Sequence, residues 1–360
     1  MTVDSAPARP PLAPPADRRA RLDAFKAARR RAADWILSHQ NPDGSLGNAA
    51  DGYHFYRAPW TLALVGETEA ANAVCGWFRR NLLTPDGRID GPFRVVSDAW
   101  AYRDSALIVG AQMLGQYDLS LGLMPELLRW QDAQSGAFAN DRMADGEMGD
   151  DQSIPYAAGP GFAALATGDL ATARRVAEFL AKIYDAQREL PDRFFYDWSR
   201  SRQAPTTEFR DEDAFWYVVE NQADRNQRWT IGGIAAAFLC RLYLAEGERA
   251  AGYLDLARRY QAFSMAATPA QFKYGPVCKS GWGSSLLYEI TGEPEYEAWT
   301  YRMGDWFVEH QDPAGFWPVI GKGPEGGSET PLANLIHNAL EFTMHIDTII
   351  AGLASRPVPE

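Results

Sequence analysis

The feature that most constrains this 360-residue chain is a glycine that recurs at the end of apolar helical runs. In five places an apolar run ends in a glycine, and acidic or polar residues follow at once. Glycine is the usual cap after a last helical residue because it adopts a positive φ without a steric penalty. The polar residues after it begin a new helix, so each glycine predicts one helical hairpin. The five glycines are Gly66, Gly115, Gly168, Gly247 and Gly292.

A second repeat lies at the other end of the hairpins. Several helices end in a glutamine, which is followed by a glycine turn and then by an apolar or aromatic residue. The glutamine is expected to cap the helix end, while the aromatic residue packs on the next hairpin. The pairs that carry this pattern are Gln40 with Gly44, Gln131 with Gly136, and Gln311 with Gly315.

Helical periodicity predicts twelve segments that alternate between apolar, small-residue-rich helices and charged amphipathic helices. The segments are 18–40, 57–66, 68–83, 99–115, 117–131, 154–167, 169–186, 229–246, 248–266, 280–291, 293–311 and 331–354. Buried helices alternating with half-buried ones are what a ring of inner helices inside a ring of outer helices requires. The predicted fold is therefore all-α, a single (α/α)6 toroid over residues 18–354, in which the last helix is inner and the first is its outer partner. An open α-solenoid is the alternative.

Two segments fall outside the predicted ring. Residues 1–17 are rich in proline and alanine and are expected to form a disordered arm. Residues 190–227 form an insertion with two β-favouring runs, 193–198 and 215–219, which are expected to pair as a small hairpin. The insertion is either a lid over one mouth of the ring or a simple elaboration of a loop.

In its glutamine, glycine and aromatic turns the chain resembles the α/α-toroid superfamily of terpenoid cyclases and protein prenyltransferase β subunits. The resemblance covers most of residues 18–354 and implies the toroid fold, which sugar epimerases and several glycoside hydrolases also use. Class II terpenoid cyclases protonate an alkene with the middle residue of an Asp-x-Asp-Asp motif. The nearest string here, at 211–214, lacks the final Asp. In the prenyltransferases an Asp, a Cys and a His hold zinc. Cys278 and His337 match that pattern, but Pro276 stands at the Asp position.

The composition of the chain limits the classes of partner that it is expected to bind. The formal charge of −12 argues against a nucleic-acid surface, and three cysteines in 360 residues cannot form a disulfide framework. There is no run of 18 apolar residues, so no membrane insertion is expected, and the expected location is the cytoplasm. A small-molecule substrate is the expected partner, and the oligomeric state stays open. We expect no cofactor, because no cofactor motif occurs, and no metal, because no three or four ligands have suitable spacing.

The candidate site residues lie where loops enter the inner helices, because in a toroid these loops converge on one mouth of the ring. The candidate catalytic residues are His337, Glu341, Cys278, Asp104, Asp150 and Asp151. The candidate substrate-binding residues are His54, Tyr56, Arg57, Trp60, Trp100, Tyr102, Tyr156, Trp229, Trp282 and Asn334.

The strongest local signal is in the last helix, where His337, Glu341 and His345 follow one another at intervals of four residues. Such residues share one face of a helix. We expect His337 to act as a base, Glu341 to orient it, and Cys278 or Asp104 to supply the acid. A polar stripe that only bonds neighbouring helices is the alternative.

Cys278 and the pair Asp150 and Asp151 are candidate acids because nearby charges are expected to shift their pKa values. Lys279 and a helix N-terminus are expected to lower the pKa of the Cys278 thiol. In the adjacent pair Asp150 and Asp151, repulsion is expected to raise one pKa, which would suit a general acid. A helix cap is the alternative for both aspartates and for Asp104.

Three functions remain open. The first is a cofactor-independent lyase, isomerase or cyclase that uses acid–base or carbocation chemistry on a hydrophobic, isoprenoid- or polyketide-like molecule in an aromatic-lined cavity. The second is a carbohydrate-active enzyme, either a sugar 2-epimerase with a histidine base or a glycoside hydrolase. The third is a toroid that binds a ligand without catalysis. Apolar or hydroxyl-reading side chains in the cavity would separate the first two.

Overall fold

The computed structural model describes residues 15–48, 54–90, 100–141, 146–318 and 332–356, and within them twelve α-helices. The odd-numbered helices are α1 (Pro15–Leu37), α3 (Thr68–Asn81), α5 (Tyr117–Leu128), α7 (Leu170–Asp185), α9 (Ala251–Met265) and α11 (Pro294–Glu309). The even-numbered helices are α2 (Ala58–Leu64), α4 (Trp100–Met113), α6 (Ile154–Thr167), α8 (Ile231–Glu246), α10 (Lys279–Thr291) and α12 (Leu332–Ala354).

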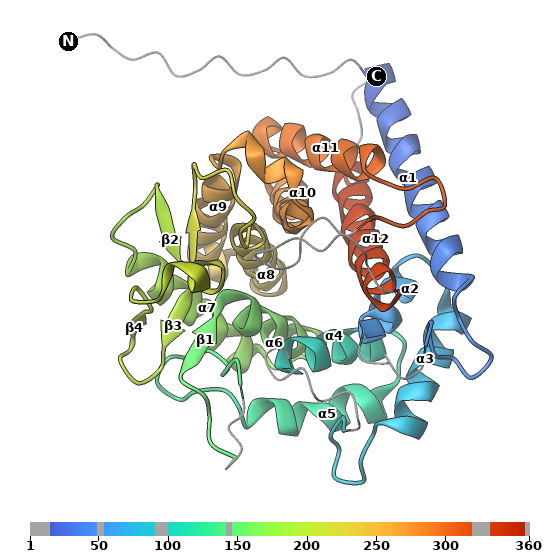
Figure 1. Ribbon diagram of the computed structural model, residues 1–360, viewed down its shortest axis with the longest axis horizontal. Coiled ribbons are helices and arrows are strands. Elements are labelled where there is room, and N and C mark those ends of the chain that lie inside the picture. Colours follow the sequence, from blue (N-terminus) through green and yellow to red (C-terminus); the bar gives the residue numbers. More distant parts are fainter. Residues whose placement is uncertain (1–14, 49–53, 91–99, 142–145, 319–331, 357–360) are drawn as a thin grey trace.

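The even-numbered helices form a closed inner ring (Figure 1). Each contacts the next one along the chain, and α12 contacts α2, which completes the circle. The odd-numbered helices lie outside, and each packs on an inner helix, with α1 against α12. The predicted (α/α)6 toroid is thus confirmed, including the inner position of the last helix and the outer position of the first. An open solenoid is excluded, because its two end helices would not meet.

Small residues set how closely the inner helices approach. A Cβ on Gly233 of α8 would lie 2.1 Å from the carbonyl oxygen of Lys279 in α10, and one on Gly110 of α4 would lie 2.3 Å from the amide nitrogen of Trp60 in α2. Only glycine permits these contacts, since a Cβ at that distance overlaps the backbone opposite. The five predicted turn glycines all have positive φ, between 65° and 85°.

The glutamines of the second repeat tie neighbouring hairpins together. The side-chain amide of Gln40 donates to the carbonyl of Ala70 in α3, and that of Gln311 donates to the carbonyl of Ala28 in α1. Gln131 donates to the carbonyl of Gly136 in its own loop and, at 3.4 Å, to that of Thr172 in α7. Each of these glutamines therefore bonds to the adjacent outer helix, in place of the expected cap on its own helix. These bonds connect neighbouring hairpins around the ring.

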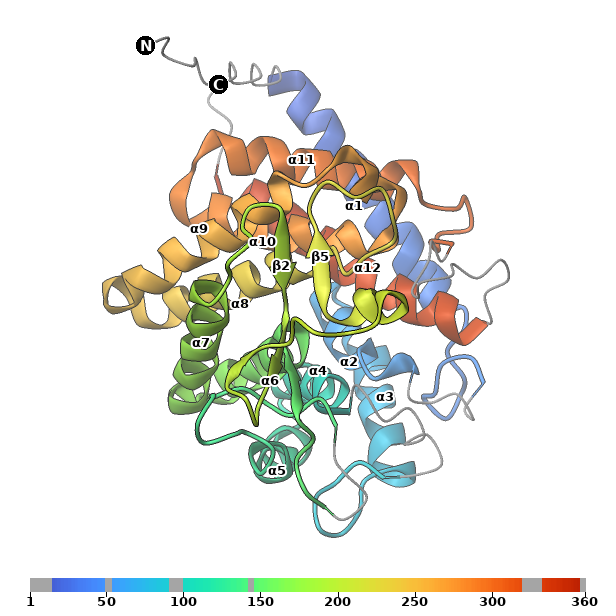
Figure 2. The same ribbon diagram turned by 60° about the vertical axis from the view of Figure 1, so that its left-hand side comes forward.

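The insertion folds as two small antiparallel sheets with a 3-10 helix between them. Strand β2 (Arg193–Phe195) pairs with β5 (Val218–Glu220), so the predicted pairing of the two β-favouring runs is confirmed. The second half of the first run is a separate strand, β3 (Asp197–Ser199), which pairs with β1 (Asp151–Ser153) and β4 (Ala204–Pro205). The 3-10 helix η4 spans Asp211–Trp216. Figure 2 shows β2 and β5 side by side in front of the inner helices.

The first and last helices form the two ends of the described ring. Helix α1 begins at Pro15, so residues 15–17 of the predicted disordered arm are helical, and the rest of the arm lies outside the described residues. Helix α12 ends at Ala354, the predicted end of the ring. In the part of the chain that the structure describes, no helix has both the length and the apolar character needed to cross a membrane.

Candidate active site

A cavity of about 220 Å³ opens at the mouth of the ring, where the inner helices begin. The N-terminal part of every inner helix, or the loop just before it, contributes side chains to its wall, and the insertion adds one phenylalanine. The described lining residues are Tyr56, Arg57, Tyr102, Arg103, Pro155, Tyr156, Phe215, Arg228, Thr230, Gly275, Cys278, Lys279, His337, Asn338, Glu341 and Phe342. Most of these residues carry a polar group and five are aromatic, so in this cup polar groups lie among apolar ring surfaces.

Glu341 lies at the centre of the charged groups in this cup. Its Oε1 forms an ion pair with Lys279 Nζ, and its Oε2 is 3.6 Å from Arg57 Nη2. The two histidines of the predicted stripe flank it along α12. His337 Nε2 is 3.5 Å from Oε2, and His345 Nε2 is 3.7 Å from Oε1. The Glu341 side chain is only 9% exposed, so both cations are held against it in a region of low dielectric.

Burial and charge fix the protonation states around Glu341. Burial alone would lower the pKa of Lys279, but the attraction of Glu341, with smaller effects of Tyr102 and Cys278, raises it above its ordinary value. Burial raises the pKa of Tyr56 to about 12. Burial lowers the pKa of His345 to about 4, so its ring is neutral near pH 7. The cup therefore offers a permanent ammonium, a permanent guanidinium and a neutral phenol.

Arg57 is held in one orientation by two tyrosines. Its Nη2 donates to the hydroxyl of Tyr56 at 3.0 Å and to that of Tyr102 at 3.2 Å. Its guanidinium carbon also lies 5.2 Å and 5.3 Å from the centres of the same two rings. A planar cation stacked and hydrogen-bonded in this way loses little entropy when it binds a further oxygen atom.

His337 lies between two hydrogen-bond acceptors. Its Nδ1 is 3.3 Å from the carbonyl oxygen of His54, and its Nε2 is 3.5 Å from Glu341 Oε2. In the neutral tautomer with the proton on Nδ1, Nε2 holds the lone pair at the cavity wall. The negative charge of Glu341 lies at this same nitrogen and attracts the positive charge that forms when Nε2 takes up a proton. The predicted base and its orienting carboxylate are thus neighbours on the cavity wall.

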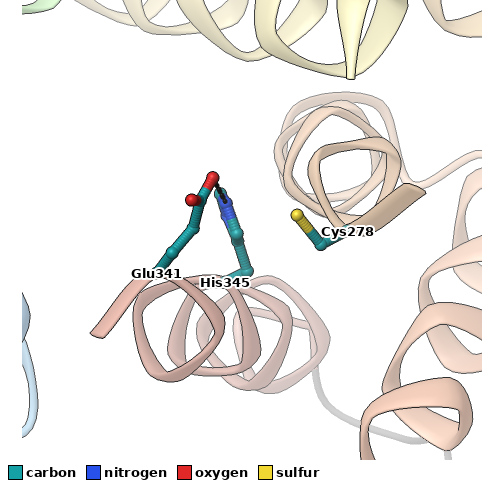
Figure 3. A group of neighbouring side chains, drawn as sticks. All are labelled: Cys278, Glu341 and His345. Atoms are coloured by element: carbon teal, nitrogen blue, oxygen red, sulfur yellow. Dashed lines mark ion pairs between the residues drawn. The ribbon is translucent and has the colours of Figure 1, made fainter. Parts of the chain in front are cut away.

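Cys278, Glu341 and His345 could together hold a metal ion, because one donor atom of each lies within 4.8 Å of the other two (Figure 3). The expectation that no three ligand residues meet is therefore wrong. These residue types match zinc ligands. However, Lys279 and Arg57 already neutralise the carboxylate, and their charges oppose a divalent cation at the same place. That the protein needs no metal stays a prediction.

The predicted tryptophans form the floor of the cup and its surroundings. Trp282 stacks on Phe162 with ring centres 4.6 Å apart, and Trp60 meets both rings. These side chains fill the interior of the ring and leave a void of only about 10 Å³ there. Trp282 also lies 5.3 Å from the His345 ring. Trp100 packs against Trp130 instead of lining the cavity.

The other predicted binding residues take different places. Tyr56, Arg57, Tyr102 and Tyr156 line the cavity. His54 touches the edge of the His337 ring, and the buried Trp229, like Asn334 on the first turn of α12, is outside the lining.

The predicted aspartates also lie outside the described lining of the cup. Asp104 is half-buried on α4. Asp150 and Asp151 lie at the start of β1, where Asp150 accepts bonds from the Ser199 hydroxyl at 2.6 Å and the Ser201 amide at 2.7 Å. Burial and the neighbouring Asp150 raise the pKa of Asp151, the direction expected for adjacent carboxylates.

Arg103 and Lys279 line the cup and belong to the loops at the mouth of the ring, whose polar residues are candidates. The candidate residues do not include Arg228, which directly precedes Trp229, or Phe215, which comes from η4 of the insertion. The sequence signal for Arg228 is its position beside a candidate residue at the entry to an inner helix. No signal in the sequence shows that Phe215 reaches the cavity.

The fold and the site define the chain as an (α/α)6 toroid with a cup of polar and aromatic side chains at one mouth. No protein-family model matches the sequence, and no curated protein matches it. Among solved structures, it is similar to a D-mannose isomerase, with 12% identity, a TM-score of 0.62 and coverage of 94% of this chain and 99% of the other. A family 76 glycoside hydrolase (mannosidase) from Bacteroides thetaiotaomicron has 11% identity, a TM-score of 0.61 and coverage of 92% and 100%. A type II terpene cyclase from Scytonema has 12% identity, a TM-score of 0.58 and coverage of 94% and 99%. At these identities the likeness shows the fold alone.

Proposed function

We propose that the protein is a cofactor-independent isomerase or epimerase that moves a proton at the carbon next to a carbonyl group in a small polyhydroxylated substrate. The observation that carries this proposal is the group formed by His337, Glu341, Arg57 and Lys279 on one cavity wall. It unites a histidine base, the carboxylate that stabilises the protonated base, and two fixed cations. This is the set of groups that proton abstraction next to a carbonyl requires.

The reaction would proceed in two proton transfers. Nε2 of His337 takes the proton from the carbon, and the electron pair of the broken C–H bond forms a carbon–carbon double bond while the carbonyl oxygen becomes an enolate. Arg57 and Lys279 are the N–H donors for that oxygen, and their positive charges stabilise it. The imidazolium then returns the proton to the neighbouring carbon, after a proton shift between oxygens, or to the opposite face of the same carbon, after the enolate has turned over in the cup.

Size and polarity favour a sugar over an isoprenoid. The cavity of about 220 Å³ has room for a monosaccharide, and aromatic rings fill the interior of the ring beneath it. Its wall carries arginines, a lysine, tyrosines, Thr230 and Asn338, which can bond hydroxyl groups. The similarity to a D-mannose isomerase over nearly the whole chain agrees with this choice.

The other enzymatic possibilities have less support from the geometry. A glycoside hydrolase needs two carboxyl groups that flank the scissile bond. Among the described residues of the cavity wall, Glu341 is the only carboxylate, and two cations already hold it. A polyene cyclase needs a carboxylic acid above a deep apolar cavity, but Trp60, Phe162 and Trp282 fill that space.

The insertion has the position of a lid in this proposal. Phe215 of η4 contributes to the cavity wall, while β2 and β5 anchor both ends of the segment to each other. Gln227 closes its base, because its side chain accepts from the amide and donates to the carbonyl of Glu220. An apolar side chain over the cup would keep water away from the enolate.

Hydrogen exchange with solvent tests the proposal. The protein is incubated in D2O with aldohexoses, ketohexoses and pentoses, together with their uronates and 6-phosphates, and ¹H NMR follows the proton at the carbon next to the carbonyl. The proposal predicts loss of that signal for one sugar series, accompanied by a new isomer or epimer. Retention of the proton in every sugar, with the protein folded throughout, would contradict it.

A further inference from the structure

Conversion of an aldose into a ketose requires a second proton transfer, which the histidine base does not perform. Abstraction of the first proton leaves a negative oxygen on the former carbonyl carbon and a hydroxyl group on the carbon that lost the proton. The ketose forms only after the hydroxyl proton has moved to the negative oxygen. The group that carries it must give one proton and accept another. The charged groups of Lys279 and Arg57 have N–H donors but no lone pair that accepts, so they do not suit this step.

A hydroxyl group can both donate and accept, and Tyr102 places one beside Arg57. Tyr102 lies in the first turn of α4 and lines the cavity. Its hydroxyl oxygen accepts from Arg57 Nη2 at 3.2 Å. The same Nη2 is 3.6 Å from Glu341 Oε2, and that oxygen is 3.5 Å from Nε2 of His337. The Tyr102 hydroxyl and the proposed base are therefore the two ends of one continuous row of groups on the cavity wall.

The hydrogen atom of the Tyr102 hydroxyl is available to a ligand. Among the described residues, the bond from Arg57 is the one hydrogen bond of this hydroxyl, and in it Tyr102 accepts. The O–H group can therefore donate to an oxygen atom in the cavity. In the proposed reaction Arg57 binds the negative oxygen of the substrate, so the hydroxyl lies beside the atom that needs a proton.

Arg57 Nη2 also donates to Tyr56, but the two tyrosines differ in burial. Tyr56 is 3% exposed, whereas Tyr102 is half-buried. Burial raises the pKa of Tyr56 to about 12, which disfavours the negative oxygen that a proton carrier forms during the transfer. At Tyr102 the bond from the guanidinium stabilises such a charge, because hydrogen bonds between ionised groups are the strong ones.

Packing against α6 fixes the ring of Tyr102. A Cβ on Gly159 of α6 would lie 2.7 Å from Cδ2 of Tyr102 and 3.2 Å from its Cα, so the tyrosine packs directly on this glycine. The ring of Tyr156, also in α6, meets the Tyr102 ring edge to face with centres 6.4 Å apart. None of these contacts involves the Tyr102 hydroxyl. Removal of the hydroxyl alone should therefore leave the ring in place.

We propose that the hydroxyl of Tyr102 carries the proton between the two substrate oxygens, so that the protein converts an aldose into a ketose. This inference rests on the proposed function and selects isomerisation over epimerisation within it.

The step balances as follows in protons and electrons. Tyr102 gives its hydroxyl proton to the negative oxygen, and its own oxygen takes the proton of the neighbouring substrate hydroxyl. The electron pair of that O–H bond forms the new carbonyl group. The electron pair of the carbon–carbon double bond takes the proton of the His337 imidazolium at the former carbonyl carbon. Tyr102 and His337 both return to their starting protonation states.

The variant Tyr102→Phe separates the two proton transfers. With an aldose that the wild type exchanges in D2O, ¹H NMR measures the deuterium gained at the carbon next to the carbonyl and the ketose formed. Without the hydroxyl, His337 still removes and returns a proton, so deuterium should still enter the aldose. The ratio of ketose formation to exchange should fall about 10²-fold or more, the usual effect of losing a proton-transfer group.

The matched control is Tyr56→Phe, which removes the other hydroxyl that Arg57 Nη2 binds, at 3.0 Å. Loss of that bond weakens the orientation of Arg57 and should slow exchange and ketose formation together, so their ratio should stay at the wild-type value. An equal fall of the ratio in both variants would show that the orientation of Arg57 controls isomerisation, and would overturn the role of Tyr102.

Failure of this inference can be told apart from failure of the proposed function. A wild type that exchanges deuterium and forms an epimer but no ketose would overturn the role of Tyr102, as would a wild-type ratio in Tyr102→Phe. Proton abstraction by His337 would stand in both cases. Absence of exchange in every sugar would contradict the proposed function, and this inference with it.

Discussion

At the scale of single residues, His345 gives the protein a pH-dependent stability. Its ring is fully buried, and burial lowers its pKa from 6.5 to about 4. Between these two values the unfolded chain binds a proton that the folded protein does not. Stability should therefore fall as the pH falls from 6.5 to 4, by up to about 3 kcal/mol from this residue.

The variant His345→Asn isolates this contribution, because other groups titrate in the same range. Urea denaturation at intervals from pH 7 to pH 4 should show a smaller loss of unfolding free energy in the variant than in the wild type. Parallel curves for the two proteins would show that His345 is accessible to protons in the folded state.

At the same scale, the sequence predicts which residues share a helix face but not which residues meet across helices. The spacing of His337, Glu341 and His345 predicts one helix face, and the structure places all three side by side. The same spacing says nothing about Lys279 and Arg57, which reach Glu341 from two other helices. Contacts between residues far apart in the chain depend on the tilt and rotation of each helix, and periodicity does not encode these.

At the scale of elements, the close contact between α8 and α10 depends on Gly233. A Cβ there would lie 2.1 Å from the carbonyl oxygen of Lys279, so Gly233→Ala must push the two helices apart. Overpacking of this kind costs about 1 to 3 kcal/mol. Because Lys279 is part of the candidate site, the substitution should lower both the melting temperature and the catalytic rate.

The control for Gly233→Ala is Gly252→Ala in α9, where nothing lies within 4 Å of the added Cβ. That change should raise stability by about 0.5 to 1 kcal/mol, because alanine is the better helix former. Thermal denaturation of both variants provides the comparison. Equal melting temperatures of Gly233→Ala and Gly252→Ala would contradict the close packing of α8 against α10.

The elements differ in how well the sequence predicts them. The boundaries of most of the long helices are correct to within three residues, since apolar periodicity and the turn glycines such as Gly168 mark both their length and their ends. Strand β1 was missed because its three residues, Asp151–Ser153, are polar and lack β-favouring side chains. It forms only because β3 of the insertion lies beside it.

At the scale of the whole molecule, the ring determines which residues can meet. The twelve helices of the described chain, in six inner–outer pairs, bring the beginnings of all inner helices to one mouth, so the general place of the site follows from the topology. The chemical character of the cavity wall does not follow from the topology. The sequence suggests an aromatic cavity from its many tryptophans, but Trp60 and Trp282 pack into the floor. The aromatic residues that line the cavity, together with its cations, are Tyr56, Tyr102, Tyr156, Phe215 and Phe342.

The most direct test of the central claim, that His337 is the base of a proton transfer, compares deuterium exchange by the wild type, His337→Gln and His310→Gln. Glu341 is unsuited, because its loss would leave the buried charges of Lys279 and Arg57 without a counterion. His310 is a matched control, since its Nδ1 also faces a backbone carbonyl, that of Trp306, but at the end of outer helix α11. The account predicts that His337→Gln slows exchange of the preferred sugar by about 10² to 10⁴, with little change in melting temperature, while His310→Gln exchanges at the wild-type rate. Exchange by His337→Gln at the wild-type rate would contradict it.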